Sequence, residues 1–271
     1  IEQLVGGDWY LPRNRNPLSE PTPEPGARAA NAAAAIAAAP ARAMPTPQRV
    51  AAAPQAPAAP VEIPDELSPA DKVAAMVELN AEVAACTKCA LCQTRKQTVF
   101  GEGDANAKLV FVGEAPGADE DEQGVPFVGK GGQLLTKMIT AMGLSREQVF
   151  ICNTLKCRPP ENRDPKREQL ECCWSHLTRQ LQIIRPTVIV TLGNPATRSL
   201  LQTKAGITKL RGTWQTLPDH APGLGGIKVM PTFHPSFVIR CYTAEVRGHA
   251  WTDLQMVMEE LGLKTPDPKK K

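Results

Sequence analysis

The sequence predicts an α/β domain in which a central, mostly parallel four-stranded sheet lies between two layers of helices. Three observations lead to this prediction. Short apolar runs of strand length recur between residues 108 and 231, segments with helical periodicity separate them, and conspicuous polar segments follow the strand ends. Strands that alternate with helices are typical of a parallel sheet that is covered on both faces.

Four segments have the length and apolar composition of buried strands. They are Lys108–Val112, Val149–Asn153, Thr187–Leu192 and Ile227–Pro231. Open parallel sheets bind their ligands outside the carboxyl ends of the strands. We therefore expect a site where Gly113, Asn153 and His234 follow or end three of these strands.

Five segments are predicted to form the helices. They are the segment from Ser68 to Cys86, then Gly132–Met142, Pro165–Ile184, Pro195–Leu201 and Val246–Leu261. In the first, Ser68 and Pro69 are typical of an N-cap followed by proline in the first turn. Apolar residues from Val73 to Val83 then recur with helical spacing.

The N-terminal quarter of the chain has a different composition. Residues 21–60 contain 18 Ala and 9 Pro, and proline at this frequency prevents long helices. We interpret residues 11–64 as a disordered linker, because such a segment cannot bury a core. The chain is thus divided into an N-terminal segment with a linker (1–67), a folded domain (68–264) and a basic tail (265–271).

The composition of the 271-residue chain also excludes some classes of protein. No run approaches the roughly 20 apolar residues of a membrane span, and residues 1–10 do not resemble a signal peptide. We therefore expect no membrane partner and a reducing, cytoplasmic location, where clustered cysteines indicate metal binding before disulfides. A net charge of +3 is compatible with nucleic-acid binding but does not demonstrate it.

Four of the eight cysteines form two pairs that are distant in the sequence: Cys86 with Cys89, and Cys157 with Cys173. Thiolates suit Zn²⁺ or an iron–sulfur cluster, and the spacing leaves both open, together with a set of buried free thiols. Cys92 extends the first pair to C-x2-C-x2-C, and Cys172 competes with Cys173 as the fourth ligand. Cys152 and Cys241 are expected to be ordinary buried cysteines.

Five segments together resemble the family 4 uracil-DNA glycosylases, the branch of that superfamily that contains an iron–sulfur cluster. They are VFGEG (99–103), GEAPGADEDEQGVPFVGKGG (113–132), NTLKCRPPENRDP (153–165), LRGTW (210–214) and TFHPSFVIR (232–240). The resemblance extends from about Cys86 to Leu263, and residues 1–67 lie outside it. A relative that crosslinks to abasic DNA carries an extra basic loop, which residues 204–209 lack.

The resemblance implies a three-layer uracil-DNA glycosylase fold and a [4Fe–4S] cluster held by Cys86, Cys89, Cys157 and Cys173. It implies a monomeric base-excision-repair enzyme, located at the nucleoid, that hydrolyses the bond between uracil and deoxyribose in single- or double-stranded DNA. No lysine is placed as a clear Schiff-base nucleophile, so we expect no strand cleavage. A catalytically weak, damage-binding iron–sulfur protein and a zinc-containing α/β hydrolase acting on nucleotides are the alternatives.

Three residues are expected to be catalytic. Departure of uracil leaves negative charge on the base and positive charge on the sugar, and a water molecule must be positioned. We expect His234 to donate a hydrogen bond to uracil O2, with a role as a turn cap as the alternative. Glu114 and Glu120 match functional acids of the family, and either could orient the water. The rest of the acidic run 119–122 is expected to be solvated.

Four residues are expected to bind uracil, and three to bind DNA. The Asn153 amide carries the donor and the acceptor that uracil O4 and N3–H require, the Phe127 ring would stack on the base, and the Ala115 backbone amide and Asn162 complete the set. Candidates for phosphate binding are Lys130, Ser236 and Arg240. Phe237 and Val238 could wedge into the base stack, and a place in the core is the alternative for Val238. His176, on the long helix, is expected at the surface.

Overall fold

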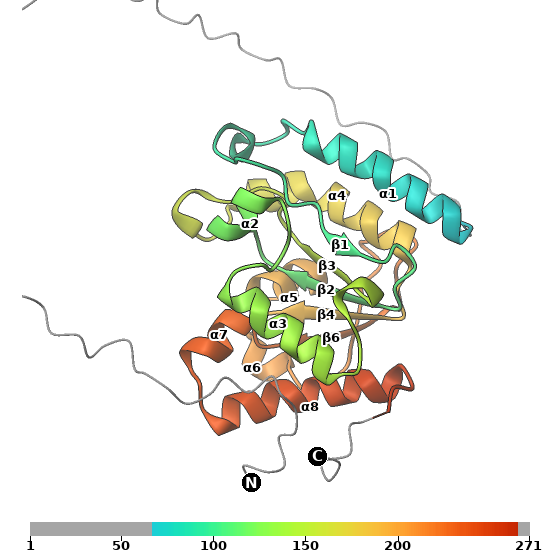
Figure 1. Cartoon of the computed structure of the whole chain (residues 1–271), viewed down its shortest axis with the longest axis vertical. Coiled ribbons are helices and arrows are strands. Elements are labelled where there is room, and N and C mark those ends of the chain that lie inside the picture. Colours follow the sequence, from blue (N-terminus) through green and yellow to red (C-terminus); the bar gives the residue numbers. More distant parts are fainter. Residues whose placement is uncertain (1–66, 265–271) are drawn as a thin grey trace, which may run out of the picture. The chain divides into compact units, whose positions relative to one another are not determined.

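The computed structural model describes residues 67–264, in which a mixed sheet lies between two layers of helices. Figure 1 shows the sheet between α1 and α4 on one side and α3 and α8 on the other. The predicted N-terminal segment with its linker (1–67), apart from Leu67, and the basic tail (265–271) lie outside the described residues. The three-layer α/β class is confirmed.

The sheet of the described domain has six strands in the order β1-β3-β2-β4-β6-β5. They are β1 (Glu102–Gly103), β2 (Leu109–Gly113), β3 (Phe150–Asn153), β4 (Val188–Leu192), β5 (Gln215–Thr216) and β6 (Lys228–Thr232). The four predicted strands are β2, β3, β4 and β6, and they run parallel. The predicted number of four strands is wrong, because β1 and β5 add antiparallel edges. Each has two residues, too few to show an alternating pattern.

The helices are close to their predicted bounds. They are α1 (Pro69–Ala84), α2 (Ala118–Gln123), α3 (Lys130–Ala141), α4 (Arg167–Ile184), α5 (Asn194–Leu201), α6 (Ile207–Leu210), α7 (Pro235–Arg240) and α8 (Ala244–Glu260), with single 3-10 turns at Ala90–Gln93, Arg146–Gln148 and Pro160–Asn162. The short helices α2, α6 and α7 were not predicted. Ser68 caps α1 as expected, because its hydroxyl accepts a hydrogen bond from the Asp71 amide at 3.2 Å.

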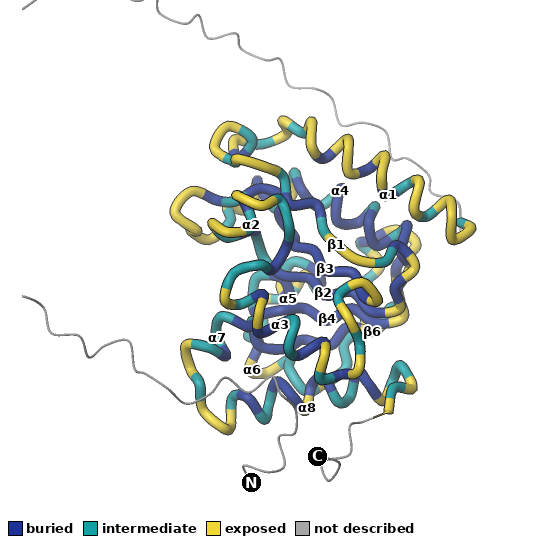
Figure 2. Tube along the Cα trace, viewed as in Figure 1, coloured by how far each residue is buried: buried dark blue, intermediate teal, exposed yellow. Residues whose placement is uncertain are grey.

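Alternating strand residues divide the core between the two faces of the sheet. Leu109 and Phe111 face the cluster that contains α3 and α8, whereas Val110 and Val112 face the one that contains α1, α4 and α5. Figure 2 shows the strands as the most deeply buried part of the described chain. This two-sided burial explains why the strands are continuous apolar runs.

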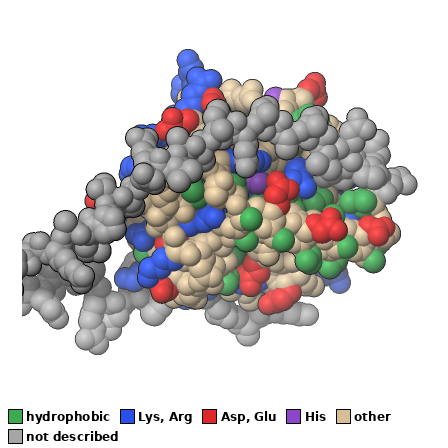
Figure 3. All heavy atoms as spheres, turned by 90° about the horizontal axis from the view of Figure 1, so that it is seen from above, with side chains coloured by type: hydrophobic (Ala, Val, Ile, Leu, Met, Phe, Trp, Pro, Cys, Tyr) green, Lys and Arg blue, Asp and Glu red, His purple; other side chains and the backbone are tan. Residues whose placement is uncertain are grey.

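Helix α1 is less completely buried than the other long helices. Val73 and Val77 are 51% and 66% exposed on it. Figure 3 shows the face that contains α1, with hydrophobic side chains exposed beside acidic ones. No helix in residues 67–264 combines the length and the apolar character that crossing a bilayer requires.

A buried ion pair holds α8 against the strand that leads to the predicted site. The Asp253 carboxylate on α8 is fully buried and accepts hydrogen bonds from Arg211 Nη2 at 2.6 Å and Thr232 Oγ1 at 2.7 Å. Arg211 also donates to the His249 carbonyl at 2.7 Å. Because Thr232 ends β6 two residues before His234, this ion pair supports the start of the following loop.

We expect Arg211→Met to destabilise the domain strongly, because it leaves the buried Asp253 carboxylate without its countercharge. Breaking such a pair costs about 3–5 kcal/mol. For a domain of this size, that lowers the midpoint of thermal unfolding by roughly 6–20 °C. Lys228→Met is the control, since it removes an exposed ion pair with Glu260 that contributes about 1 kcal/mol or less. Equal unfolding midpoints for the two variants, measured by circular dichroism, would contradict this prediction.

Candidate active site

A cavity of about 960 Å³ opens at the carboxyl ends of the parallel strands. The connections after β2, β3, β4 and β6 line it. Strand β2 lies between β3 and β4, so the chain direction across the sheet reverses there. Open α/β sheets bind ligands at such a switch point.

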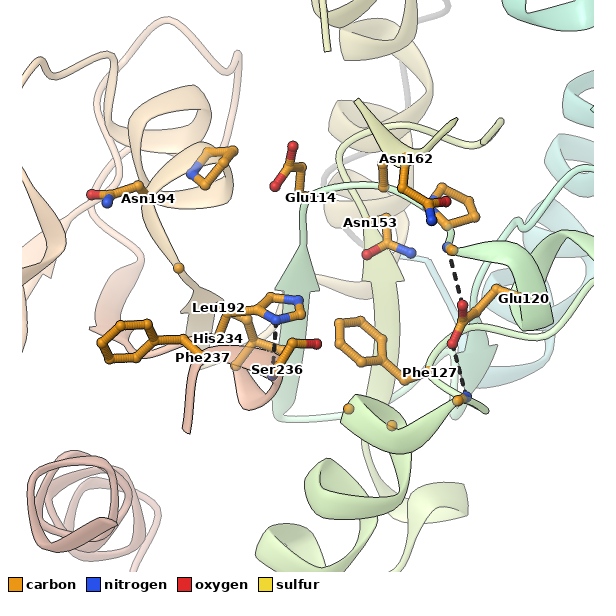
Figure 4. A pocket seen from close by; sticks show the side chains of 18 of the residues that line it. Glu114, Glu120, Phe127, Asn153, Asn162, Leu192, Asn194, His234, Ser236 and Phe237 are labelled. Carbon is orange, nitrogen blue, oxygen red and sulfur yellow. Dashed lines mark hydrogen bonds between the residues drawn. The ribbon is translucent and has the colours of Figure 1, made fainter. Parts of the chain in front are cut away.

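All ten residues of the predicted catalytic, uracil-binding and phosphate-binding sets line this one cavity. They are Glu114, Ala115, Glu120, Phe127, Lys130, Asn153, Asn162, His234, Ser236 and Arg240. They come from segments up to 126 residues apart in the sequence, counting from Glu114 to Arg240. Figure 4 shows Asn153 near Glu114 and Phe127, with His234 across the cavity. Their individual roles remain predictions.

Asn153 is held at the end of β3 with an unpaired acceptor. It is 2% exposed and lies in register with Gly113 of the neighbouring β2. Its Oδ1 atom is buried and has no hydrogen-bond partner among the described residues. Behind it, the buried Lys156 donates from Nζ to the Asn153 carbonyl at 2.8 Å and to Gln180 Oε1 at 2.6 Å. A buried acceptor without a partner is costly, so it indicates a donor supplied by a ligand.

The Phe127 ring is positioned by its own strained backbone and by two glycines. Phe127 has φ +54°, a conformation that is uncommon for a bulky residue. Arg146 donates to its carbonyl at 3.1 Å and stabilises that backbone. A methyl group at Gly132 would lie 1.8 Å from this carbonyl oxygen, and one at Gly113 would lie 2.5 Å from the ring. The ring centroid is 5.8 Å from that of His234.

His234 follows β6 and caps α7. Its Nδ1 atom accepts a hydrogen bond from the Ser236 amide at 3.2 Å, which places the proton of the neutral ring on Nε2. Burial, with a smaller contribution from Arg240, lowers the pKa of His234 to about 4. The side chain is therefore a neutral cap whose Nε2–H can donate to a ligand, so the two roles considered from the sequence are compatible.

The two predicted catalytic carboxylates have different environments. Glu120 accepts hydrogen bonds from the amides of Gly117 at 3.0 Å, Val128 at 2.9 Å and Gly129 at 3.0 Å. Glu114 is half-buried, and its carboxylate has no hydrogen-bond partner among the described residues. Burial, and then the nearby Asp164, raises the pKa of Glu114 above its usual range.

The remaining acids of this run are not all solvated. Asp121 is 2% exposed and accepts a hydrogen bond from the Lys96 amide at 3.0 Å, so the prediction of a solvated side chain is wrong for this residue. The carboxylate connects α2 to the loop that follows the first cysteines. Asp119 and Glu122 are exposed as expected.

The predicted DNA contacts lie around the mouth of the cavity. Lys130 and Arg240 are exposed, at the start of α3 and the end of α7. These helices meet at Gly131, where an added methyl group would lie 2.7 Å from Ser236 Oγ. Val238 is fully buried in the core, so the hypothesis of a base wedge is wrong for it. Phe237 lines the cavity, with its ring centroid 5.0 Å from that of Phe233.

The four predicted metal ligands line a second, small cavity with two further thiols. Cys157 and Cys173 are buried, and Cys86, Cys89, Cys92 and Cys172 are half-buried. No group of three or more His, Cys, Asp or Glu side chains in residues 67–264 is arranged to hold a single metal ion. The pairs that are distant in sequence are nevertheless brought together around one cavity, as the predicted ligand role requires.

The surroundings of the sulfur atoms fit an anionic iron–sulfur cluster. Arg95 Nη1 lies 3.1 Å from Cys157 Sγ, and His176 Nε2 lies 3.3 Å from Cys86 Sγ. The buried Lys156 lines the same cavity, and no described carboxylate forms an ion pair with it. Hydrogen-bond donors around cysteine sulfurs are the outer-shell partners expected of such a site.

The burial of two residues differs from the prediction, and a third residue of the cysteine site was not predicted. His176 was predicted at the surface but is 1% exposed. Its position three residues after Cys173 on one helix was an available signal, because such residues share a helix face. Cys241 was predicted to be buried and is exposed. Lys156 was not singled out, although it lies inside the NTLKCRPPENRDP segment.

Comparison with known proteins shows the family of the chain. Residues 100–255 match the model of the Uracil DNA glycosylase superfamily. The type-4 uracil-DNA glycosylase of Thermotoga maritima is 43% identical over 182 residues, 66% of this chain and 92% of the relative. Those of Saccharolobus solfataricus and Archaeoglobus fulgidus are 43% and 41% identical over 68% of this chain, and 85% and 92% of the relatives. The chain therefore belongs to the uracil-DNA glycosylase superfamily, and within it to the type-4 enzymes.

Proposed function

We propose that the protein is a monofunctional uracil-DNA glycosylase. It hydrolyses the N-glycosidic bond of deoxyuridine in DNA, releases uracil and leaves an abasic site for base excision repair. The observation that carries this proposal is the buried, unpaired Oδ1 of Asn153, which faces the cavity that His234 lines from the other side.

Asn153 distinguishes uracil from cytosine by its donor and acceptor pattern. Uracil N3–H donates to Oδ1, and uracil O4 accepts from Nδ2. Cytosine presents an acceptor at N3 and a donor at N4, which reverses both partners. A buried mismatch leaves polar groups unpaired, and sites of this kind reject the wrong ligand by several orders of magnitude. Lys156 holds the backbone of Asn153 in place through its hydrogen bond to the Asn153 carbonyl.

His234 stabilises the leaving group. The C1′–N1 bond breaks with its electron pair on uracil, so negative charge grows on O2 and O4. The Nε2–H group of the neutral His234 donates to O2, and the Ala115 backbone amide lies in the same cavity. One donor of this kind contributes about 3–4 kcal/mol to transition-state stabilisation.

Glu114 orients the attacking water. The water oxygen bonds to C1′ of the cationic sugar, and its proton passes to the carboxylate. The carboxylate of Glu114 has no competing hydrogen bond among the described residues, and this supports the role. Glu120, whose oxygens accept three backbone hydrogen bonds, acts as a positioning residue that holds the loop carrying Phe127. The Phe127 ring stacks on the base, a contact that contributes about 1–3 kcal/mol.

DNA binds across the mouth of the cavity with the target base turned out of the stack, because the glycosidic bond is unreachable inside the helix. Lys130, Ser236 and Arg240 bind phosphates together with the amides at the start of α3. Asn162, held at the opposite rim by Arg158 Nε at 2.8 Å, contacts the nucleotide. The enzyme acts as a monomer on single- or double-stranded substrates.

A [4Fe–4S] cluster is held by Cys86, Cys89, Cys157 and Cys173. When bound, it supplies a structural link between the turn after α1, the loop after β3, and α4. Cys157 lies four residues after Asn153, so this link supports the loop that carries the base-reading amide. Residues 68–264 are the catalytic domain, residues 1–67 are a linker that activity does not require, and the enzyme works in the cytoplasm at the nucleoid.

Release of uracil from labelled oligonucleotides tests the proposed activity. We expect abasic product from U:G, U:A and single-stranded substrates. His234→Ala should lower turnover about 100- to 1,000-fold while DNA affinity, measured by fluorescence anisotropy, changes little. Absence of abasic product at enzyme concentrations stoichiometric with DNA would instead favour a damage-binding protein.

Asn153→Asp should weaken the preference for uracil over cytosine. A protonated carboxyl can donate to cytosine N3 and accept from N4, whereas an ionised one repels uracil O4. We expect the ratio of kcat/KM for the two bases to fall by at least about 100-fold. Asn80→Asp makes the same chemical change at an exposed position of α1 outside the cavity and should leave the ratio nearly unchanged. An unaltered ratio in Asn153→Asp would refute the assignment.

The pH dependence of kcat/KM should show an acidic limb set by Glu114. Burial, and then the nearby Asp164, raises the pKa of Glu114, so its carboxylate becomes protonated, and loses the ability to accept a proton, at a higher pH than an ordinary glutamate does. His234 stays neutral down to about pH 4, so we expect no additional step near pH 6.5. In Glu114→Gln, activity should be low with the acidic limb abolished. A limb near pH 6.5 that persists in this variant would identify a histidine instead.

A further inference from the structure

Two side chains of the cysteine site each contact a different sulfur ligand. Arg95 Nη1 lies 3.1 Å from Cys157 Sγ, and His176 Nε2 lies 3.3 Å from Cys86 Sγ. We propose that Arg95 and His176 together raise the reduction potential of the cluster and protect it from oxidation. This inference rests on the [4Fe–4S] cluster that forms part of the proposed function.

A second hydrogen bond holds the Arg95 guanidinium beside the sulfur of Cys157. Its second terminal nitrogen, Nη2, donates to the Ala84 carbonyl at 3.0 Å, at the end of α1. The side chain is half-buried and lines the cysteine cavity. A guanidinium is always charged, so the bond to Cys157 is a charge-assisted hydrogen bond to a thiolate.

His176 reaches the opposite side of the site from α4. Its Nδ1 atom is 3.8 Å from Glu82 Oε1, beyond hydrogen-bond distance, and has no other partner among the described residues. An iron-bound thiolate only accepts hydrogen bonds, so Nε2 carries the proton and donates to Cys86. Glu82 is itself held by an ion pair with Arg179, which stabilises the wall beside the ring.

Donors to sulfur favour the more reduced state of a cluster. Reduction adds negative charge, part of which resides on the sulfur ligands, and a hydrogen-bond donor stabilises the more negative state more strongly. Hydrogen bonds to the sulfurs and the nearby charge are two of the factors that set the potential of a cluster. Removing either donor therefore lowers the potential and makes loss of an electron easier.

The experiment uses the iron-loaded full chain and the variants Arg95→Met and His176→Phe. Spectroelectrochemical titration gives the midpoint potential of each protein. Oxidation by ferricyanide, in which one electron passes from the cluster to ferricyanide to give ferrocyanide, gives the rate of bleaching. Arg95→Lys and His176→Gln keep a donor group at each position.

Two controls separate the sulfur contacts from changes in charge and size. Arg167→Met removes an arginine of α4 that pairs with Glu171. His220→Phe removes a histidine that stacks on Trp174 with ring centroids 5.1 Å apart. Neither residue lines the cysteine cavity.

We expect Arg95→Met and His176→Phe each to lower the midpoint potential and to bleach roughly tenfold faster, with partial recovery in the donor-keeping variants and no shift in the controls. Unchanged potentials and bleaching rates in iron-loaded Arg95→Met and His176→Phe would overturn the inference and leave the proposed function intact. If His176→Phe fails to fold, the Arg95 variants decide. A wild-type protein that binds stoichiometric zinc and no iron would overturn the cluster itself.

Discussion

The parallel pairing of β2 with β3 is the constraint on which the rest of the site depends. It places Gly113 beside Asn153 at the carboxyl edge of the sheet. Because Gly113 has no side chain, the Phe127 ring and the Asn153 amide both fit against it. A shift of this pair by one residue would turn the amide to the other face of the sheet. A single backbone register thus fixes the positions of the two side chains that we propose to read and stack on the base.

Several site residues combine a structural and a chemical role on different atoms. His234 caps α7 with Nδ1 and presents Nε2 to the cavity. Asn153 has its carbonyl held by Lys156, while its side-chain oxygen has no partner in the described domain. The structural contact fixes the orientation of the group that we propose to act on uracil, and such preorganisation is what electrostatic catalysis requires.

Long elements and the position of the site could be predicted from the sequence, whereas short elements and long-range polar contacts could not. Helix α4 and strand β4 have strong local patterns, and the site follows from where polar residues end the strands. Helix α2 has six residues, and its Glu120 bonds to amides eight and nine residues onward, which no periodicity records. The position of His176 three residues after Cys173 could have indicated its burial, but its contact with Cys86, 90 residues away, leaves no local pattern.

The two glycines that contact Phe127 limit how this scaffold can be redesigned. Any side chain at Gly113 or Gly132 would collide with the ring or the carbonyl of Phe127, so both positions admit one amino acid. Mutant libraries that seek a new base preference should keep these glycines fixed. They can vary exposed positions of the cavity wall such as Ala118 and Thr208, where a replacement side chain can turn toward solvent.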